Sequence, residues 1–402
     1  MTDLADDSRN STVASTDADQ QANWGGVLAM TLCVFAPIAS EFMPMSLLTP
    51  IAAELQVSEG MAGQGIAISG VFAVVTSLSI SWIARGLNRK LLLLGLTALM
   101  GLSGGIVSLA PNYLTYMLGR ALIGVVIGGF WSMSAATAMR LVPVSQVPKA
   151  LAIFNSGNAL ATVIAAPLGS YLGSIIGWRG AFLALVPIAM IALIWQWVAL
   201  PSMGAPSRPV GATHVFRLLG RPSVVIGLAA SGAFFMGQFT PFTYVRPFLE
   251  TVTQVDVQTL SLILLLVGVA GFFGTALIGM FLKKSLYGTL IIITLLMALI
   301  ALALVQVGEW IIPAAGLLGL WGLMATAAPV GWWSWVAQAM PKDVEAGGGL
   351  MVAVVQFAIA SGSLLGGWIF DNSGYQSTFI ASAAILMLGT GLIVLAKRES
   401  LA

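Results

Sequence analysis

Long apolar runs dominate the sequence and restrict the chain to a membrane fold. A membrane-spanning helix needs about 20 predominantly apolar residues. Of the 402 residues, 58% are hydrophobic and 8% charged, whereas a soluble domain has about 25% charged residues. The sequence therefore predicts an all-α membrane protein with twelve transmembrane helices, at 24–48, 62–84, 91–110, 114–139, 150–173, 180–200, 224–247, 259–282, 286–307, 311–339, 348–370 and 377–396.

The positions of lysine and arginine predict the orientation. Cytoplasmic loops of membrane proteins carry an excess of these residues. With the N-terminus inside, the cytoplasmic segments hold 14 of the 17 basic residues and the outer side only Arg179, while Arg120 and Arg246 fall within spans. A shift of the topology by one span would reverse this bias, so we expect both termini in the cytoplasm.

One hydrophilic connection, 201–223, divides the chain. It separates two groups of six spans, at 24–200 and 224–398, and contains the single His214, which we expect to be a solvated loop residue. Residues 1–23 carry five aspartates and one arginine, unlike the basic start of a signal peptide. We expect this segment to be a disordered acidic cytoplasmic tail, and 399–402 to be a second, short tail.

The two groups of spans share short sequence patterns in the same order, at offsets of 197 and 202 residues. Span one contains E-F-x-P-x5-P, and span seven contains Q-F-x-P-x5-P, 197 residues later. The motif G-aromatic-W-S occurs at 129–132 in span four and at 331–334 in span ten. Such duplicated halves are typical of transporters that rock one bundle against the other around a site near the membrane midplane. We expect two pseudo-symmetric six-helix bundles; the alternative is a duplication that only sets the fold.

Glu41 is the candidate proton carrier. It lies about 26 Å along span one from Trp24, in the outer half of the membrane. A carboxylate inside a bilayer costs roughly 2.5–3.5 kcal/mol on insertion scales, and burial disfavours the ionised form. Such a group can bind and release a proton near neutral pH, according to which side is hydrated. The alternative is a carboxylate near the outer rim that stays solvated.

Arg120 is the candidate partner of Glu41. It lies about 10 Å inside the membrane from Tyr113, at a depth similar to that of the carboxylate. A contact between the two would stabilise the ionised carboxylate. In the alternative interpretation, Arg120 caps backbone carbonyls or extends toward the interface.

Further polar and aromatic side chains are candidates for binding substrate. Gln238 takes the position of Glu41 in the second half and cannot titrate. An amide there can bind a neutral polar substrate, or it can join helices. Aromatic side chains can stack on a planar ligand or face lipid. The candidate substrate-binding residues are Phe42, Phe130, Trp131, Asn155, Asn158, Gln238, Tyr244, Arg246, Trp333 and Gln356.

Several classes of chemistry lack the required residues. The single Cys33 excludes an internal disulfide, and together with the single His214 it makes a zinc site implausible. No phosphate-binding glycine loop, H-E-x-x-H or Ser–His–Asp set is present. We therefore expect no enzyme, no metal and no cofactor, with an ion gradient as the energy source.

The sequence resembles the major facilitator superfamily over nearly its whole length. The motifs that carry the resemblance include EFMPMSLLTPIAAEL at 41–55, LGRALIGVVIGGF at 118–130, APLGSYLG at 166–173 and GQFTPFTYVRP at 237–247. Within the superfamily it is most similar to the twelve-span drug:proton antiporters, and among these to bacterial purine ribonucleoside efflux pumps.

The resemblance implies roles for individual residues. Arg120 matches the arginine implicated in proton coupling, and 166–169 matches a motif associated with export, with Ala166 in place of its usual glycine. In the loop after span two, Arg85 stands where the family has an aspartate that contributes to gating.

The resemblance also implies a function. We expect a monomeric, multi-pass protein of the bacterial inner membrane that exports purine ribonucleosides such as inosine and guanosine in exchange for protons. Its partners would be nucleosides, protons and lipid, with no nucleic acid. Alternatives are export of sugars or amphipathic drugs and, less favoured, uptake by symport. An intramembrane enzyme or a sensor would need a catalytic set or a signalling domain, and the sequence contains neither.

Overall fold

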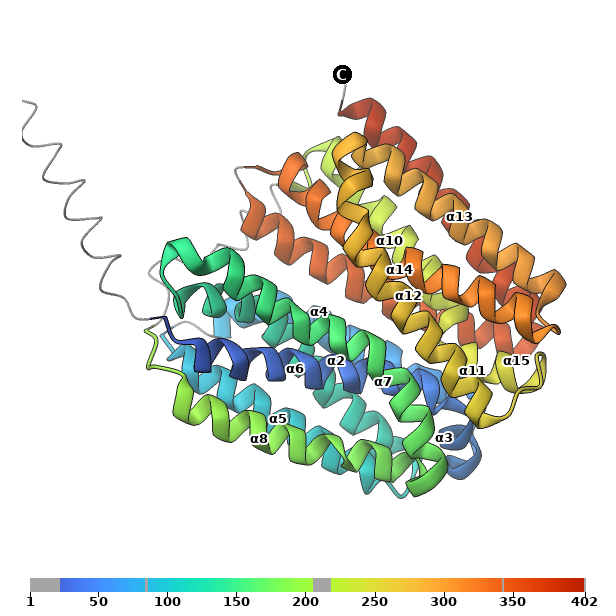
Figure 1. Ribbon diagram of the computed structural model, residues 1–402, viewed down its shortest axis with the longest axis horizontal. Helices are drawn as coiled ribbons and strands as arrows, with labels where there is room; N and C mark the ends of the chain where they lie inside the picture. Colours follow the sequence, from blue (N-terminus) through green and yellow to red (C-terminus); the bar gives the residue numbers. More distant parts are fainter. Residues whose placement is uncertain (1–21, 84–85, 205–217, 342, 401–402) are drawn as a thin grey trace, which may run out of the picture.

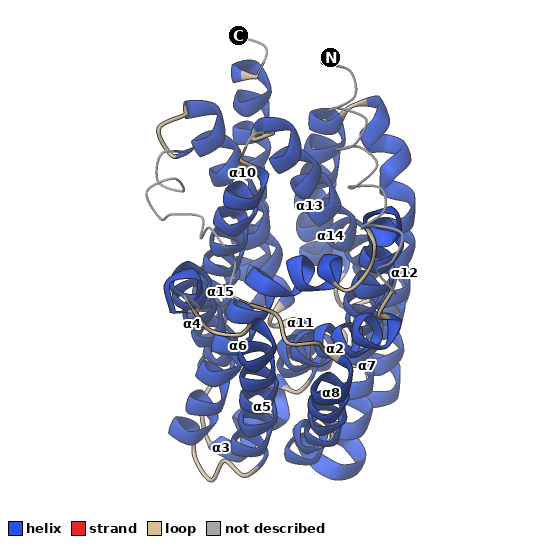
Figure 2. Ribbon diagram, turned by 90° about the vertical axis from the view of Figure 1, so that its left-hand side faces the viewer, coloured by secondary structure: helices blue, strands red, loops and turns tan. Residues whose placement is uncertain are grey.

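The computed structural model describes residues 22–83, 86–204, 218–341 and 343–400. Within these ranges the regular structure is helical (Figure 2). The elements are α2 (Trp24–Ser46), α3 (Leu48–Leu55), α4 (Glu59–Ile83), α5 (Arg89–Ser108), α6 (Tyr113–Arg140), η1 (Val144–Gln146), α7 (Val147–Leu183), α8 (Leu185–Ala199), α10 (Pro222–Phe242), α11 (Val245–Thr251), α12 (Val257–Lys284), α13 (Leu286–Val307), α14 (Ile311–Ala339) and α15 (Val344–Glu399).

Ten helical stretches within the described residues are long and apolar enough to cross a membrane, so the chain is a multi-pass membrane protein. Two of them, Val144–Ala199 and Ala346–Glu399, contain 56 and 54 residues. Each is interrupted by a glycine with non-helical backbone angles, Gly177 (φ 74°) and Gly374 (φ 76°). A straight helix of that length would extend about 80 Å, far more than a bilayer. Interpreting each as two spans would give twelve, which stays a prediction.

The elements up to α8 and those from α10 onward form two groups, here called the N half and the C half (Figure 1). Helices α4 and α7 of the N half pack against α15 and α12 of the C half. The largest apolar cluster lies in the C half but also includes Met45 and Ile66 from the N half. The two halves therefore share part of their packed interior.

The internal repeat predicted from sequence recurs in the backbone. α2 is broken at Leu47 and α3 begins at Leu48, and 197 residues later the break at Tyr244 is followed by α11. The interrupting glycines of α7 and α15 are also separated by 197 residues. Proline explains the first pair of breaks, because Pro44 and Pro241 weaken the helix that they end. Glycine explains the second, because only glycine adopts positive φ without steric cost.

Short polar side chains fix where several helices begin. The carboxamide oxygens of Asn23, Asn88 and Asn112 accept hydrogen bonds from the first-turn amides of α2, α5 and α6. The carboxylate of Asp256 does the same for α12. Such caps satisfy amides that have no partner within the helix. Most of the tail 1–23 and of the linker 201–223 lies outside the described residues, and so do His214 and Arg85. The predictions made for these segments and residues therefore remain untested.

Candidate functional site

Glu41 lies near the end of α2, at the junction of the two halves. It is 9% exposed. Among the residues whose side chains the structure describes, it is the only aspartate or glutamate in the buried class. Its carboxylate interacts with the charge of Arg120 and with the side-chain amide of Gln356 on α15. A carboxylate of the N half thus lies near a polar side chain of the C half and interacts with it electrostatically.

Arg120 is fully buried in α6 and binds backbone carbonyl oxygens. Its Nε donates to the carbonyl oxygen of Gly65 on α4 at 3.0 Å, and its Nη1 donates to that of Ser40 on α2 at 2.8 Å. The Ser40 carbonyl is available because the residue four positions on, Pro44, has no N–H to donate. These contacts match the carbonyl-capping interpretation of Arg120.

One nitrogen of the same guanidinium has no partner. Nη2 of Arg120 is buried without a hydrogen bond, and no ion pair with Glu41 within 4.0 Å is found among the described residues. Arg120 therefore holds three helices together while the NH₂ group at Nη2 remains available for a further acceptor. In this conformation its effect on Glu41 acts through the electrostatic field, without a direct ion pair.

Pro44 frees the Ser40 carbonyl and Arg120 binds it, which gives a prediction about stability. Arg120→Lys leaves one of the two carbonyls unpaired, which costs about 1–3 kcal/mol. In a Pro44→Ala background, the new amide at position 44 can donate to Ser40, so the same substitution should cost less. A double-mutant cycle of thermal unfolding in detergent measures the coupling. Purely additive effects would contradict the assignment.

In the C half, too, a proline leaves a helical carbonyl without its amide donor, and a different side chain supplies the hydrogen bond. Pro241, in α10, leaves the carbonyl of Gly237 without its helical donor, and Ser382 Oγ donates to that carbonyl at 2.6 Å. Gln238, at the position equivalent to Glu41, is 7% exposed, and its Oε1 has no hydrogen-bond partner. The two halves therefore differ in charge at their equivalent positions: an acid and an arginine on one side, an amide and a hydroxyl on the other.

The other predicted substrate residues fall into two groups. Phe42 packs against apolar clusters of both halves, and Trp131 is half-buried beside two clusters of the N half. The others are engaged in packing or lie at the surface. Phe130 lies in the core, Asn155 is exposed with its amide bonded to the Leu151 carbonyl, Asn158 is half-buried, and Trp333 is exposed.

Tyr244 and Arg246 lie in a seam between the halves, where the Tyr244 ring packs into an apolar cluster whose other buried members come from the N half. The Tyr244 hydroxyl donates to the Ser363 carbonyl at 2.7 Å. Arg246 Nε pairs with Glu250 at 2.8 Å, and its Nη1 donates to the Ser46 carbonyl at the end of α2. That carbonyl is available because Pro50, four residues on, has no N–H. Arg246 of the C half thus binds the C-terminus of an N-half helix.

Asp371 of α15 completes this seam. Its carboxylate accepts hydrogen bonds from Ser58 Oγ at 2.5 Å and from the backbone amide of Gly60 at 3.0 Å, at the start of α4. Ser46, Ser58, Gly60, Arg246 and Asp371 lie at one end of the bundle, here called the Asp371 end. In this structure the two halves are joined there.

Sequence reasoning missed the seam, although one signal for it was present. The acceptors at Ser40 and Ser46 follow from prolines four residues later, and the two buried arginines supply donors. A search for prolines in apolar spans together with unassigned arginines would have found both pairs. Nothing comparable indicated the contact of Asp371 with α4, which depends on how the halves meet.

Comparison with known proteins identifies the fold. A sequence model described as Major Facilitator Superfamily matches residues 30–347. The chain belongs to this superfamily. Its structure resembles that of a bacterial homologue of the human lysosomal transporter Spinster in an inward-facing, unoccupied conformation, with a TM-score of 0.74 and 15% identity, covering 94% of this chain and 97% of that one. At this identity the likeness concerns the fold.

Two relatives share more of the sequence. The chain is 63% identical over 389 residues to the Pseudomonas aeruginosa protein named transcription regulatory protein OpdE, covering 96% of this chain and 97% of that one. It is 40% identical over 382 residues to the purine ribonucleoside efflux pump NepI of Salmonella typhimurium, covering 95% and 96%. The predicted membership of the major facilitator superfamily is therefore confirmed, and the chain is a membrane transporter of that superfamily.

Proposed function

We propose that this transporter exports purine ribonucleosides such as inosine and guanosine, driven by proton entry. The observation that carries the proposal is the buried carboxyl of Glu41, which lies at the junction of the halves and interacts electrostatically with Arg120 and with Gln356 of the opposite half. The likeness to a purine ribonucleoside efflux pump over 95% of the chain supports the substrate class. Neither a metal nor a cofactor has a part in this scheme.

The chemistry of the junction suits exchange of a proton for a neutral solute. A neutral Glu41 is the favoured form where the site is closed to water. Hydration from the side of lower proton concentration favours release of the proton, and the ionised carboxylate then gains from the nearby charge of Arg120. Gln238, which stays neutral throughout, offers its unpaired Oε1 to a hydroxyl or amino group of the solute.

Alternating access requires the seam at the Asp371 end to open. Its hydrogen bonds involve Ser58, Gly60 and Asp371, together with Arg246 and Ser46. We place this end at the outer face of the bacterial inner membrane, with both termini in the cytoplasm and the chain acting as a monomer. Release of the solute would then follow separation of α4 from α15.

The direct test is transport of radiolabelled inosine by everted membrane vesicles. Because these vesicles are inverted, export appears as accumulation. We expect accumulation when the lumen is made acidic and none when the gradient is collapsed. Equal accumulation with and without the gradient would contradict proton coupling, and transport of a sugar or cationic drug but not inosine would favour the alternative efflux substrates.

Gln238 gives a prediction about substrate binding. Gln238→Leu keeps approximate size but removes the acceptor Oε1, so the Kd for inosine should rise about five- to tenfold. Gln238→Glu should restore an acceptor and leave binding closer to that of the unaltered protein at acidic pH. Filter-based binding of radiolabelled inosine to purified protein measures both. Unchanged affinity in the leucine variant would remove Gln238 from the site.

A second candidate function follows from the Pseudomonas relative, which is named a transcription regulatory protein. A transporter can alter transcription by changing the cytoplasmic concentration of an effector, without itself contacting DNA. Transcript profiles of a deletion strain complemented with the unaltered gene or with Glu41→Gln separate the two possibilities. Full restoration by the transport-deficient variant would show regulation independent of proton-driven export.

A further inference from the structure

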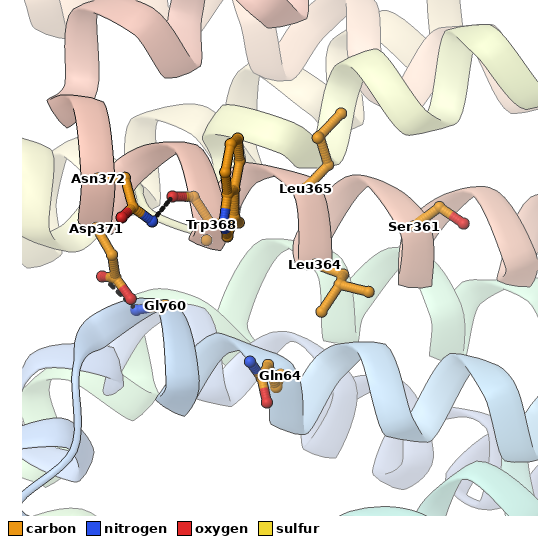
Figure 3. Close-up of a pocket in the computed structure, with 9 residues that line it drawn as sticks. Gly60, Gln64, Ser361, Leu364, Leu365, Trp368, Asp371 and Asn372 are labelled. Atoms are coloured by element: carbon orange, nitrogen blue, oxygen red, sulfur yellow. Dashed lines mark hydrogen bonds between the residues drawn. The ribbon is translucent and has the colours of Figure 1, made fainter.

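A crevice between α4 and α15 lies beside the seam and outside the junction around Glu41. It has a volume of about 470 Å³ and is lined by Gly60, Gln64, Ser361, Leu364, Leu365, Gly367, Trp368, Asp371 and Asn372 (Figure 3). Asp371 and Leu364 point from α15 toward α4, and Gln64 lies on α4 across from Leu364 (Figure 3). Sites for drug-sized molecules span about 300–1,000 Å³, so the crevice is large enough for one.

The polar groups of the crevice retain unused hydrogen-bonding capacity. The Gln64 oxygen and the Met61 carbonyl share the single proton of the Tyr113 hydroxyl, each at 3.0 Å, and the NH₂ group of Gln64 stays available. The Asn372 amide nitrogen donates to the Trp368 carbonyl at 2.7 Å, which leaves its oxygen as an acceptor. The two Asp371 oxygens each have a second lone pair beyond the bonds from Ser58 and Gly60.

The charge around the crevice is negative. Asp371 is the only charged residue among those that line it. Glu59, at the start of α4, interacts electrostatically with Asp371, Glu250 and Arg246. Three carboxylates therefore face one guanidinium in this region, and that guanidinium is engaged by Glu250 and by the Ser46 carbonyl. A cation would be attracted here, and an anion would be repelled.

The crevice also has an aromatic and apolar wall. Trp368 is 67% exposed and Leu364 is exposed beside it, on a helix that lies within a candidate membrane span. An indole face attracts organic cations by a cation–π interaction. The exposed leucine and indole together suit a flat apolar body that carries a positive charge.

We propose that this crevice is a second ligand site, selective for amphipathic organic cations, which bind against Trp368 and Asp371 of α15 and Gln64 of α4 and so bridge the two halves. The crevice is formed by both α4 and α15, so it exists only while the Asp371 end is closed. A ligand that binds one conformation preferentially shifts the population toward it. Such cations should therefore slow transport without competing with the solute. The proposal does not depend on nucleosides being the substrate.

Binding of ethidium to purified protein in detergent, measured by fluorescence polarisation, tests the site. Asp371→Asn removes the charge and keeps an acceptor for Gly60, and Trp368→Leu removes the ring. Each should raise the Kd about tenfold. Trp197→Leu is the matched control, because Trp197 is 66% exposed on α8 and does not line the crevice. It should leave the Kd unchanged.

Two competition arms locate the ligand. Inosine in excess should not displace ethidium, and the neutral analogue phenanthridine should bind at least about tenfold more weakly. Displacement by inosine would place the cation at the solute site, and equal binding of phenanthridine would remove the charge selectivity. No binding to the unaltered protein, or equal binding by both crevice variants, would overturn the proposal. Binding is compared only for variants that elute from gel filtration at the same volume as the unaltered protein. One correctly folded crevice variant is enough for the test.

Discussion

Glu41→Gln abolishes gradient-driven accumulation of inosine in everted vesicles but leaves exchange of inosine across the membrane intact. Glutamine keeps the shape and the hydrogen-bonding capacity of a neutral carboxyl, but it cannot release a proton. One proton moving down about 100 mV supplies about 2.3 kcal/mol, enough for roughly a fifty-fold solute gradient. The accumulation ratio should therefore fall from as much as about fifty to one.

The control is Glu309→Gln, at an exposed carboxylate between α13 and α14. It should retain full accumulation. Radiolabelled inosine is measured in vesicles that contain equal amounts of each variant, first with a pH gradient and then with unlabelled inosine inside and no gradient. If Glu41→Gln accumulated as much inosine as the control, Glu41 would have no role in coupling transport to the proton gradient.

Gly60→Val prevents closure of the Asp371 end and stops turnover, while the protein stays folded. A Cβ atom at position 60 would lie 2.2 Å from an Asp371 oxygen and 2.7 Å from the backbone oxygen of Gly367. The Asp371 side chain can rotate away, but a backbone carbonyl in a packed helix cannot move without separating α4 from α15. Because the closed state is part of every cycle, the transport rate should fall at least about tenfold.

Gly279→Val is the matched control, because a Cβ there would meet no atom within 4 Å. It shares the small helix-propensity change of the substitution without the clash. Spin labels at Leu109 and Ile312, exposed at the Asp371 end of the two halves, report their separation in a Cys33→Ser background. The Gly60 variant should lengthen this distance and the control should not. An unchanged distance together with normal transport would contradict the claim that closure of the Asp371 end requires glycine at position 60.

The sequence was sufficient to predict most of the fold. Runs of about 20 apolar residues permit only helices or closed barrels in a bilayer, and the repeat at an offset of 197 residues recurs in the breaks at Leu47 and Tyr244. The predicted spans also leave gaps at 174–179 and 371–376, and these contain Gly177 and Gly374, where the backbone departs from helical angles. What the apolar runs do not specify is which residue of each gap interrupts the helix.

The candidate site was only partly predictable. The depth of Glu41 and Arg120 follows from counting residues along a helix, and both are buried as expected. The partners do not follow from depth, because rotation of a helix about its axis decides which neighbour a side chain meets. Arg120 thus binds the carbonyls of Ser40 and Gly65, and Glu41 meets Gln356 from the other half.

Residues of the seam were the hardest to predict. Arg246 and Tyr244 were interpreted as substrate contacts, and in this conformation their polar groups are bonded to Ser46, Glu250 and Ser363. Of these bonds, only that between Arg246 and Ser46 joins the two halves. Which surfaces of the halves meet depends on the conformation, so a pattern along the chain does not specify such a contact. Their role toward the solute stays a prediction.

The most direct test of proton-driven export is the reverse coupling in proteoliposomes. Purified protein is reconstituted with inosine and a pH-sensitive dye in the lumen and diluted into buffer without inosine at equal pH. Antiport predicts that inosine leaving the lumen draws protons inward, so the lumen acidifies and Glu41→Gln abolishes the change. Inosine efflux that leaves the lumenal pH constant, or acidification that persists in the variant, would contradict the account.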